Sequence, residues 1–357
     1  MQIVFTSGRE PGYPRNALLK TILAEHFPLK IVTDDTRKTL PRYLRLSAKL
    51  LKVLPYGDYD LAFVGFLGQP LMPYVRTLTR RPIVFDAYLS VYDTLCFDRK
   101  VYKPRSIMGR LAFWLDRFAC DLADYVLLDT QSHVDYFVSE FNLPKEKFSR
   151  IFIGCDENIF YPRPEIQPSS PPTILYYGSF LPLQGIDIIL HAAKILKKCH
   201  MQFRLIGQGM ELERVQKLAA DLELSNIIFS PHLPVKKLPT EIASSTICLG
   251  GHFGAAQKAH RVIAGKTFQA LAMGKPTIVG ENPANHELLT HGFDAWFCKM
   301  NDPEALADAI LSILKDQELC TTLGQNAHRT FLEKASIAAL TPQVLTIVNK
   351  VRKAGLH

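Results

Sequence analysis

Short runs of apolar and β-branched residues alternate with longer amphipathic stretches along the chain. In the first half, the apolar runs predict strands at residues 3–6, 30–33, 61–65, 83–86, 125–129 and 148–153. The stretches with helical periodicity between them are 15–25, 42–53, 70–78, 106–123 and 132–141. This alternation is typical of βα units built on a parallel sheet, so we expect an α/β fold.

The alternation pauses at residues 161–172, where the sequence YPRPEIQPSSPP has no apolar periodicity. We interpret this segment as a linker between a domain at 1–160 and a second at 173–335. The last stretch, 336–357, predicts a C-terminal helix that packs back on the first domain. Two α/β halves of similar size predict two Rossmann-like domains facing each other across a cleft, with ligands beyond the carboxyl ends of the strands.

Charge and cysteine content narrow the class of protein. The formal net charge of +8 at pH 7 favours an anionic partner. The seven cysteines include no CxxC pair, so we expect neither a zinc site nor a disulfide framework. Free cysteines predict a cytoplasmic setting.

The N-terminus lacks the apolar core of a signal peptide, and we expect no membrane-spanning helix. Aromatic residues do not interleave with basic ones, which disfavours nucleic acid.

A basic cluster stands out at residues 254–288. Lys258, Arg261 and Lys266 precede a helical apolar run at 268–273, and a turn and a strand follow. A helix N-terminus that combines cations with free backbone N–H groups suits a phosphate or diphosphate. The alternative is an ordinary α/β unit with a solvated basic loop.

Two glycine-containing turns follow predicted strands in the second half. Gly178 and Ser179 end one strand, and Gly207 opens a GQG sequence after another. Glycine lets the backbone approach a phosphate closely, but each turn can equally be a tight βα connection. The GxG lacks the third glycine of a dinucleotide fingerprint, which disfavours a dehydrogenase.

The order of these pieces resembles the nucleotide-sugar half of the retaining GT-B glycosyltransferases of family 4. The similarity covers about residues 170–335 and rests on GSFLPLQG at 178–185, RLIGQG at 204–209, the cluster at 254–288 and DPEALADAILSIL at 302–314. In the first half, IGCD at 153–156 with FYP at 160–162 is similar to the family's strand end before the linker. The resemblance implies a GT-B fold and transfer of a sugar, with retention, from a nucleoside-diphosphate sugar.

The resemblance also implies a donor site in the second domain. Its expected members are Gly178, Ser179, Gly207, His252, Gly254, Lys266 and Gln269. Lys258 and Arg261 would meet the charge that develops on the leaving diphosphate, and no metal is expected because no DxD-like carboxylate pair is present.

This chain departs from the family pattern at several of these positions. Arg261 and Gln269 stand where family members usually have two glutamates. Ser179 and Gln184 stand where many have the arginine and lysine that hold the diphosphate. Gln269 can still hydrogen-bond ribose hydroxyls. The altered set leaves the identity of the donor open.

The first domain should bind the acceptor. The segment 85–100, FDAYLSVYDTLCFDRK, follows a predicted strand, and Asp86 is the candidate catalytic residue at its start. Gly12 and Asp93 are the candidate acceptor-binding residues. The carboxylates of the segment are spaced too irregularly for one helix face, so we expect them on a loop. Alternatively they pair with nearby cations, namely Arg99, Lys100, Lys103 or Arg117.

Residues 36–52, TRKTLPRYLRLSAKLLK, combine basic and apolar residues and contain no acid. Such a helix can lie on anionic lipid headgroups, or pack on the sheet with a solvated basic face. Glycosyltransferases of this type often use lipid-linked acceptors. We therefore expect a cytoplasmic protein that is peripheral on the inner face of the membrane through residues 36–52.

Together these features predict a glycosyltransferase that moves a sugar from a nucleoside-diphosphate sugar to a glycan or lipid-linked acceptor, without a cofactor. Two alternatives stay open. One is a sugar-nucleotide epimerase or phosphorylase on the same fold. The other is a non-catalytic protein that binds sugar nucleotides or polyanions. The sugar, the base, the acceptor and the oligomeric state do not follow from the sequence.

Overall fold

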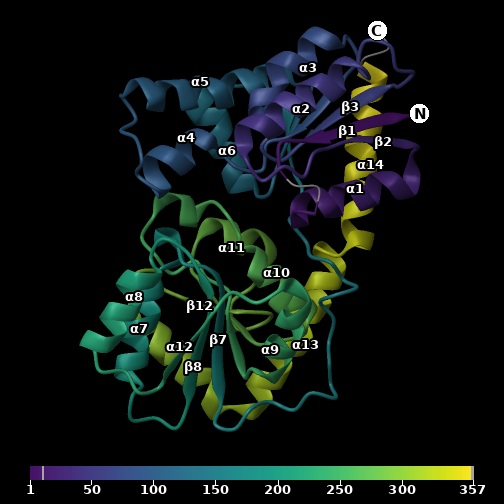
Figure 1. Ribbon diagram of the computed structural model, residues 1–357. Coiled ribbons are helices and arrows are strands. Elements are labelled where there is room, and N and C mark those ends of the chain that lie inside the picture. Colours follow the sequence, from purple (N-terminus) through teal and green to yellow (C-terminus); the bar gives the residue numbers. More distant parts are fainter. Residues whose placement is uncertain (10–11, 355–357) are drawn as a thin grey trace. The chain divides into compact units, whose positions relative to one another are not determined.

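The chain forms two compact units in the computed structural model, which describes residues 1–9 and 12–354 (Figure 1). Unit 1 comprises residues 1–153 and 337–357, and unit 2 comprises residues 154–336. Each unit has its own parallel six-stranded sheet. The predicted α/β class, with two Rossmann-like domains, is confirmed.

The sheet of unit 1 is formed by β1 (Ile3–Ser7), β2 (Leu29–Val32), β3 (Leu61–Gly65), β4 (Ile83–Asp86), β5 (Tyr125–Leu128) and β6 (Phe148–Arg150). Their spatial order is β2-β1-β3-β4-β5-β6. β1, β3, β4 and β5 are buried at every residue, as expected for parallel strands that are covered on both faces.

The helices of unit 1 are α1 (Pro14–His26), α2 (Thr39–Leu51), α3 (Met72–Leu78), α4 (Val91–Asp93), α5 (Ile107–Leu122), α6 (Gln131–Phe141) and α14 (Ile337–Ala354), with short turns η1 (Gln69–Leu71), η2 (Thr94–Asp98) and η3 (Lys145–Lys147). One apolar core joins α2, α3, α5 and α6 to the sheet. Its members include Leu46 on α2, Met72 on α3, Ala112 on α5 and Phe137 on α6. The C-terminal helix α14 packs against α1 and β4.

The sheet of unit 2 is formed by β7 (Thr173–Ser179), β8 (Gln202–Gln208), β9 (Ile227–Ser230), β10 (Ile247–Leu249), β11 (Thr277–Gly280) and β12 (Trp296–Cys298), in the order β12-β11-β10-β7-β8-β9. Its helices are α7 (Ile186–Ile195), α8 (Leu212–Asp221), α9 (Leu238–Ser244), α10 (Gly265–Ala272), α11 (Pro283–Leu288), α12 (Pro303–Lys315) and α13 (Gln317–Lys334), with turns η4 (Pro182–Gln184), η5 (Val235–Lys237) and η6 (Gln257–His260). A separate apolar core joins α7, α8, α12 and α13 to this sheet.

The proline-rich segment 161–172 belongs to unit 2 and does not form the boundary between the units, which falls at Ile153 and Gly154. Its prolines prevent helix and strand pairing, so it runs as a strap along this unit. Ser169 N–H donates to the Ser244 carbonyl at 2.8 Å, and the strap borders a hollow of about 810 Å³ with the turn at Gly274 and with α13. Composition identified an irregular segment, but could not reveal that it is packed.

The run from Gln317 to Lys353 contains one 18-residue window that is long and apolar enough to cross a membrane. The sequence reading had expected none. The window is 39% buried inside the fold, and a turn at Ala335 and Ser336 separates α13 from α14. Length and composition alone are a weak indication of a span, because helices in a protein core meet the same criteria.

Candidate functional site

Two strands of unit 2 end beside the start of α10. β7 ends in Gly178 and Ser179, and β10 leads into Gly251 and His252. The residue that precedes α10, Ala264, has no side chain to accept hydrogen bonds from the first-turn N–H groups. Because ligands of parallel sheets bind beyond the carboxyl ends of the strands, this edge is the candidate binding site of unit 2.

Lys266, in the first turn of α10, is a buried cation at this edge. Its Nζ donates a hydrogen bond to Oε1 of Gln184 and lies 4.3 Å from the ring centroid of Tyr176. None of the described carboxylates forms an ion pair with it. Burial lowers the pKa of Lys266 to about 7. An anion placed next to Nζ would therefore be strongly favoured, because it would restore the full charge of the ammonium group.

Glycine backbone faces Lys266 on two sides. Gly178 and Gly251 have φ values of +138° and +78°, which side chains rarely adopt. A Cβ atom at Gly178 would lie 3.9 Å from Nζ of Lys266, and one at Gly251 would lie 3.6 Å from it. A larger residue in place of either glycine would fill the space next to the Lys266 ammonium group. The combination of glycine backbone, a helix N-terminus and a buried ammonium group fits a phosphate or diphosphate.

His252 lies next to the same cations. It is buried, and burial lowers its pKa to about 3, with Lys266 and Lys258 acting in the same direction. The imidazole is therefore neutral at physiological pH. Its Nδ1 is buried and has no hydrogen-bond partner within the protein. Because the other ring nitrogen hydrogen-bonds the Val262 backbone, Nδ1 can accept a hydrogen bond from a ligand hydroxyl group without adding charge.

The remaining candidates lie in or just before α10 and at the end of β7. Lys258 is buried in η6, and Arg261 follows it half-buried. Gln269 is half-buried and lies three residues beyond Lys266, on the same side of α10. Ser179 is exposed at the end of β7. Contacts of these four side chains with a donor stay predictions.

Two predicted donor-binding glycines are needed for packing. A Cβ atom at Gly207 would lie 1.9 Å from the carbonyl oxygen of Gly178. One at Gly254 would lie 2.7 Å from the carbonyl oxygen of Pro182. Gly207 and Gly254 therefore allow close backbone approach that holds the site together, which accounts for both residues without a ligand.

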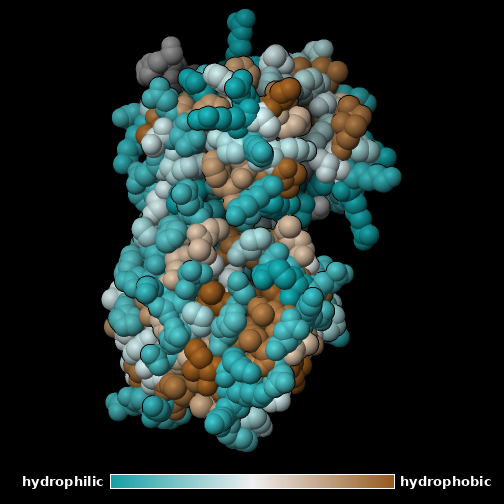
Figure 2. All heavy atoms as spheres, turned by 90° about the vertical axis from the view of Figure 1, so that its left-hand side faces the viewer, coloured by the Kyte–Doolittle hydropathy of each residue, from teal (hydrophilic) through white to brown (hydrophobic). Residues whose placement is uncertain are grey.

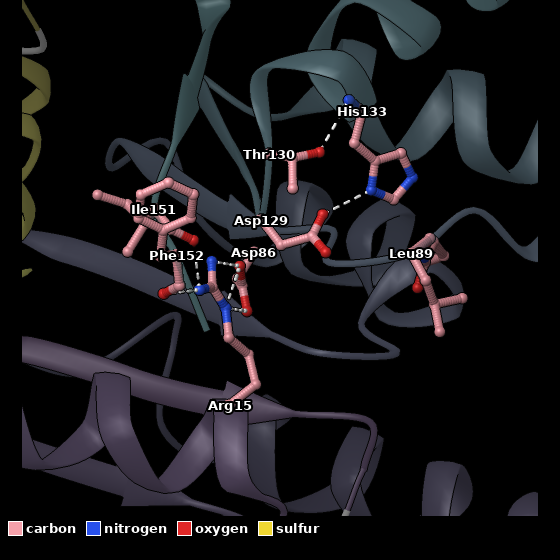
Figure 3. Close-up of polar contacts among 9 residues, drawn as sticks. Arg15, Asp86, Leu89, Asp129, Thr130, His133, Ile151 and Phe152 are labelled. Carbon is pink, nitrogen blue, oxygen red and sulfur yellow. Dashed lines mark hydrogen bonds and ion pairs between the residues drawn. The ribbon is translucent and has the colours of Figure 1, made fainter. Parts of the chain in front are cut away.

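In unit 1, Asp86 forms a buried ion pair with Arg15 (Figure 3). The Arg15 Nη2 atom donates to Oδ1 of Asp86 at 2.8 Å, and Nη1 donates to the carbonyl oxygens of Ile151 and Phe152 at 2.7 and 2.9 Å. Burial raises the pKa of Asp86, while Arg15 opposes the rise. Both side chains have no exposed surface. Asp86 therefore holds Arg15 and the chain after β6, and its predicted role as the catalytic residue has no support in this geometry.

A second buried pair lies close to the first. His133 and Asp129 are joined by a 2.7 Å contact between Nδ1 and Oδ1, and Figure 3 shows Asp129 between His133 and the Arg15 pair. The cap of α6 is Thr130, whose Oγ1 accepts from the His133 N–H at 3.0 Å. The Nε2 atom of His133 is buried without a hydrogen-bond partner in the protein.

Within the acidic segment 85–100, residues 91–98 are helical and do not form the expected loop. Asp93 ends α4 and Asp98 ends η2, and both are buried. Asp86 pairs with Arg15, which the sequence reading did not consider. Pattern alone missed this pairing because Arg15 is 71 residues away along the chain. As a buried side chain, Asp93 does not present a surface to an acceptor.

Aromatic rings gather near Gly12 at the carboxyl edge of the first sheet. Gly12 is exposed in the turn before α1. The ring centroids of Tyr13 and Phe66 are 4.8 Å apart, and those of Phe66 and Tyr88 are 4.7 Å apart. Tyr88 has a φ of +59°, a strained value for a tyrosine. Tyr13 and Tyr88 are half-buried, so their rings present partial faces to a ligand.

The basic helix at 36–52 is α2, and part of its charge is used within the fold. Lys49 Nζ donates to Oδ2 of Asp34 at 3.0 Å, and Arg45 donates to Oγ1 of Thr36 at 2.8 Å. Leu44 is 64% exposed beside them. α2 therefore packs on the sheet, and its outer face is basic with exposed leucines, while contact with a membrane stays a prediction.

The sequence analysis gave four residues near these sites no role in binding or catalysis. They are Arg15, Tyr176, Gln184 and Gly251. Gln184 lies in the 178–185 turn that the sequence analysis describes, and Gly251, a glycine soon after a strand, carried a signal of the same kind. The contact between Tyr176 and Lys266 joins positions 90 residues apart, which no local pattern could reveal. Among the residues that the structure describes, no group of three or more His, Cys, Asp or Glu side chains could hold a metal ion.

The fold of both units together is that of the GT-B glycosyltransferases. The crystal structures of HepE from Anabaena in complex with UDP and with UDP-glucose align with a TM-score of 0.73 at 17% identity. The alignments cover 98% of this chain and 100% of HepE.

Residues 159–330 match the family described as Glycosyl transferases group 1. A protein of Methanocaldococcus jannaschii described as an uncharacterised glycosyltransferase is 27% identical over 163 residues, 45% of this chain and 43% of the relative. The N-acetyl-alpha-D-glucosaminyl L-malate synthase of Bacillus anthracis is 21% identical over 243 residues, 65% of this chain and 61% of the relative. The matches thus span less than two thirds of either relative.

Proposed function

We propose that this protein is a glycosyltransferase that uses a nucleoside-diphosphate sugar as donor. The observation that carries the proposal is the buried Lys266 at the N-terminus of α10, faced by the backbone of Gly178 and Gly251. It lies within the residues that match the glycosyltransferase family. The UDP and UDP-glucose complexes of HepE, which has the same fold, support a nucleotide sugar as ligand.

In the proposed reaction, the bond between the anomeric carbon and the diphosphate breaks and the charge on the leaving diphosphate grows. Lys266 and the N–H groups that begin α10 would stabilise this charge, with Lys258 and Arg261 nearby. His252 would hold a donor hydroxyl group as a neutral hydrogen-bonding side chain. Because cations and backbone N–H groups supply this stabilisation, the mechanism needs no metal, and we infer retention from the family resemblance.

The acceptor is proposed to bind unit 1. The half-buried rings of Tyr13 and Tyr88 offer apolar faces of the kind that pack against sugar rings. A glycan or a lipid-linked sugar fits this chemistry. We propose a cytoplasmic enzyme, because all seven cysteines are free thiols, and a peripheral membrane contact through residues 36–52.

The test is a panel of nucleotide sugars, first for binding by calorimetry and then for release of nucleoside diphosphate with and without acceptors. We expect one donor to bind and to turn over when a suitable acceptor is added. Lys266→Ala should weaken donor binding by roughly 1.5–3 kcal/mol, the value of a charged hydrogen bond. Tight binding without turnover across a broad acceptor panel would favour the non-catalytic binding protein.

A further inference from the structure

Helix α5 turns a stripe of large apolar side chains away from the core of unit 1. Ile107, Leu111, Trp114 and Phe118 are between 51% and 79% exposed. Their spacing of four, three and four residues puts them on one face of the helix. The opposite face, which includes Ala112, packs into the core with the sheet. α5 therefore has two apolar faces, one packed in the core and one exposed.

The apolar patch continues into the segment before the helix. Phe97, Val101 and Tyr102 are also exposed, and so is Met108. Eight of the 20 exposed large apolar side chains of the described chain thus lie between residues 97 and 118. Scattered apolar residues are normal on a protein surface, whereas such a concentration marks an interaction site.

The charge around the stripe is mainly positive, although Asp121 is exposed near the end of α5. Asp116 is the only acidic residue in the segment 99–117, and it has no exposed surface. Its carboxylate accepts from Oγ of Ser90 at 2.7 Å and from the N–H of Tyr92 at 2.8 Å. The segment also carries six basic residues, namely Arg99, Lys100, Lys103, Arg105, Arg110 and Arg117. The outward surface therefore combines apolar side chains with an excess of positive charge.

Helix α2 extends this surface. α3 packs against both α2 and α5, and all three helices share one core on the same face of the sheet. α2 adds the exposed Leu40 and Leu44, together with Arg45 and Lys52. Figure 2 views the molecule from the side on which α5 lies in Figure 1, and on unit 1 brown apolar side chains stand among teal polar ones.

We propose that α5 and residues 97–106 insert their apolar side chains into an anionic lipid surface, and that α2 adds electrostatic contact. An interfacial helix needs apolar residues for the acyl region and cations for the headgroups, and this surface has both. A second copy of the chain fits less well, because it would bring the same positive charges face to face. The proposal does not depend on the donor site.

Tryptophan fluorescence tests the insertion directly. The chain contains two tryptophans, and Trp296→Phe leaves Trp114 on the stripe as the only reporter. With anionic vesicles of phosphatidylglycerol and phosphatidylcholine at low salt, we expect the Trp114 emission to shift to the blue. Lipids brominated on their acyl chains should quench it, and pure phosphatidylcholine vesicles should have a much weaker effect. Sedimentation with vesicles without any change in Trp114 emission would overturn the proposal.

Substitutions separate α5 from α2. Leu111→Gln with Phe118→Gln should lower vesicle partitioning by at least about tenfold, because the apolar area buried in lipid is lost. The matched control, Ile195→Gln with Leu332→Gln, removes aliphatic side chains of unit 2 that are 50% and 48% exposed, and should leave partitioning unchanged.

Two further measurements complete the test. Replacing Arg45, Lys49 and Lys52 with glutamine should cause a smaller loss that added salt mimics. All variants should bind UDP equally well. If the vesicle experiments fail while UDP still binds, only the lipid proposal is refuted and the proposed function is not affected. Full loss through α2 with none through α5, or dimerisation through α5 without lipid binding, would refute the assignment.

Discussion

Lys266 is expected to destabilise the fold in the absence of ligand, and Lys266→Met should reveal the size of this effect. Methionine keeps the length of the side chain and removes the charge. Gln184, the hydrogen-bond partner of Lys266, is half-buried and can turn to water. The substitution therefore leaves no fully buried polar group unpaired. It should raise the free energy of unfolding and lower the affinity for a nucleoside diphosphate at the same time.

The size of the effect follows from the pKa. Burial lowers the pKa of Lys266 from 10.5 to about 7, and each tenfold change in a proton equilibrium corresponds to about 1.4 kcal/mol. Near pH 7, the buried lysine then costs the fold on the order of 4 kcal/mol relative to a neutral side chain. Between about pH 7 and 10.5 the unfolded chain binds more protons at this site than the fold does. Wild-type stability from this group therefore rises with pH across that window.

The assay is urea denaturation of the wild type and of Lys266→Met at pH 7, 8 and 9, without ligand. The variant should be more stable, and its advantage should shrink by roughly 2 kcal/mol between pH 7 and pH 9. Lys194→Met, at an exposed lysine of α7, is the control and should show no such trend. An advantage of the Lys266 variant that does not change with pH would refute the argument that Lys266 titrates near neutrality.

Three other measurements test the site around Lys266 in unit 2 and the buried ion pair between Arg15 and Asp86 in unit 1. Binding of UDP at pH 8 should take up a proton, because the diphosphate raises the pKa of Lys266 again; calorimetry in buffers of different ionisation enthalpy measures the uptake, and Lys266→Met should abolish it. Arg15→Met should destabilise the protein by about 3–5 kcal/mol, because it leaves Asp86 buried without a partner, and the double variant with Asp86→Leu should recover much of that loss in denaturation experiments. Gln269→Glu should keep most of the donor affinity, whereas Gln269→Leu should cost about 1–3 kcal/mol; equal binding by the leucine variant would remove this residue from the site.

The sequence predicted most strands and helices because apolar periodicity is a local signal. The apolar runs at 3–6 and 61–65 led directly to β1 and β3. The short elements α9, α11 and β12 were missed, since each has too few residues to show a period. The position of Lys266 at a helix start was also predictable. Its burial against Tyr176 depends on the pairing of distant strands, which no local pattern contains.

The resemblance to family 4 left the altered residue Gln184 unexplained, and the structure supplies an account of it. Many family members have a lysine at this position, in the glycine turn after the first strand of the nucleotide-binding half. Here the Gln184 side chain accepts a hydrogen bond from Lys266, so an ammonium group from α10 lies next to the end of this side chain. Two ammonium groups so close together would repel each other, and each would lower the pKa of the other further. A neutral glutamine is therefore the residue that lets Lys266 keep its charge when an anion binds, and the departure from the family pattern is consistent with a working phosphate site.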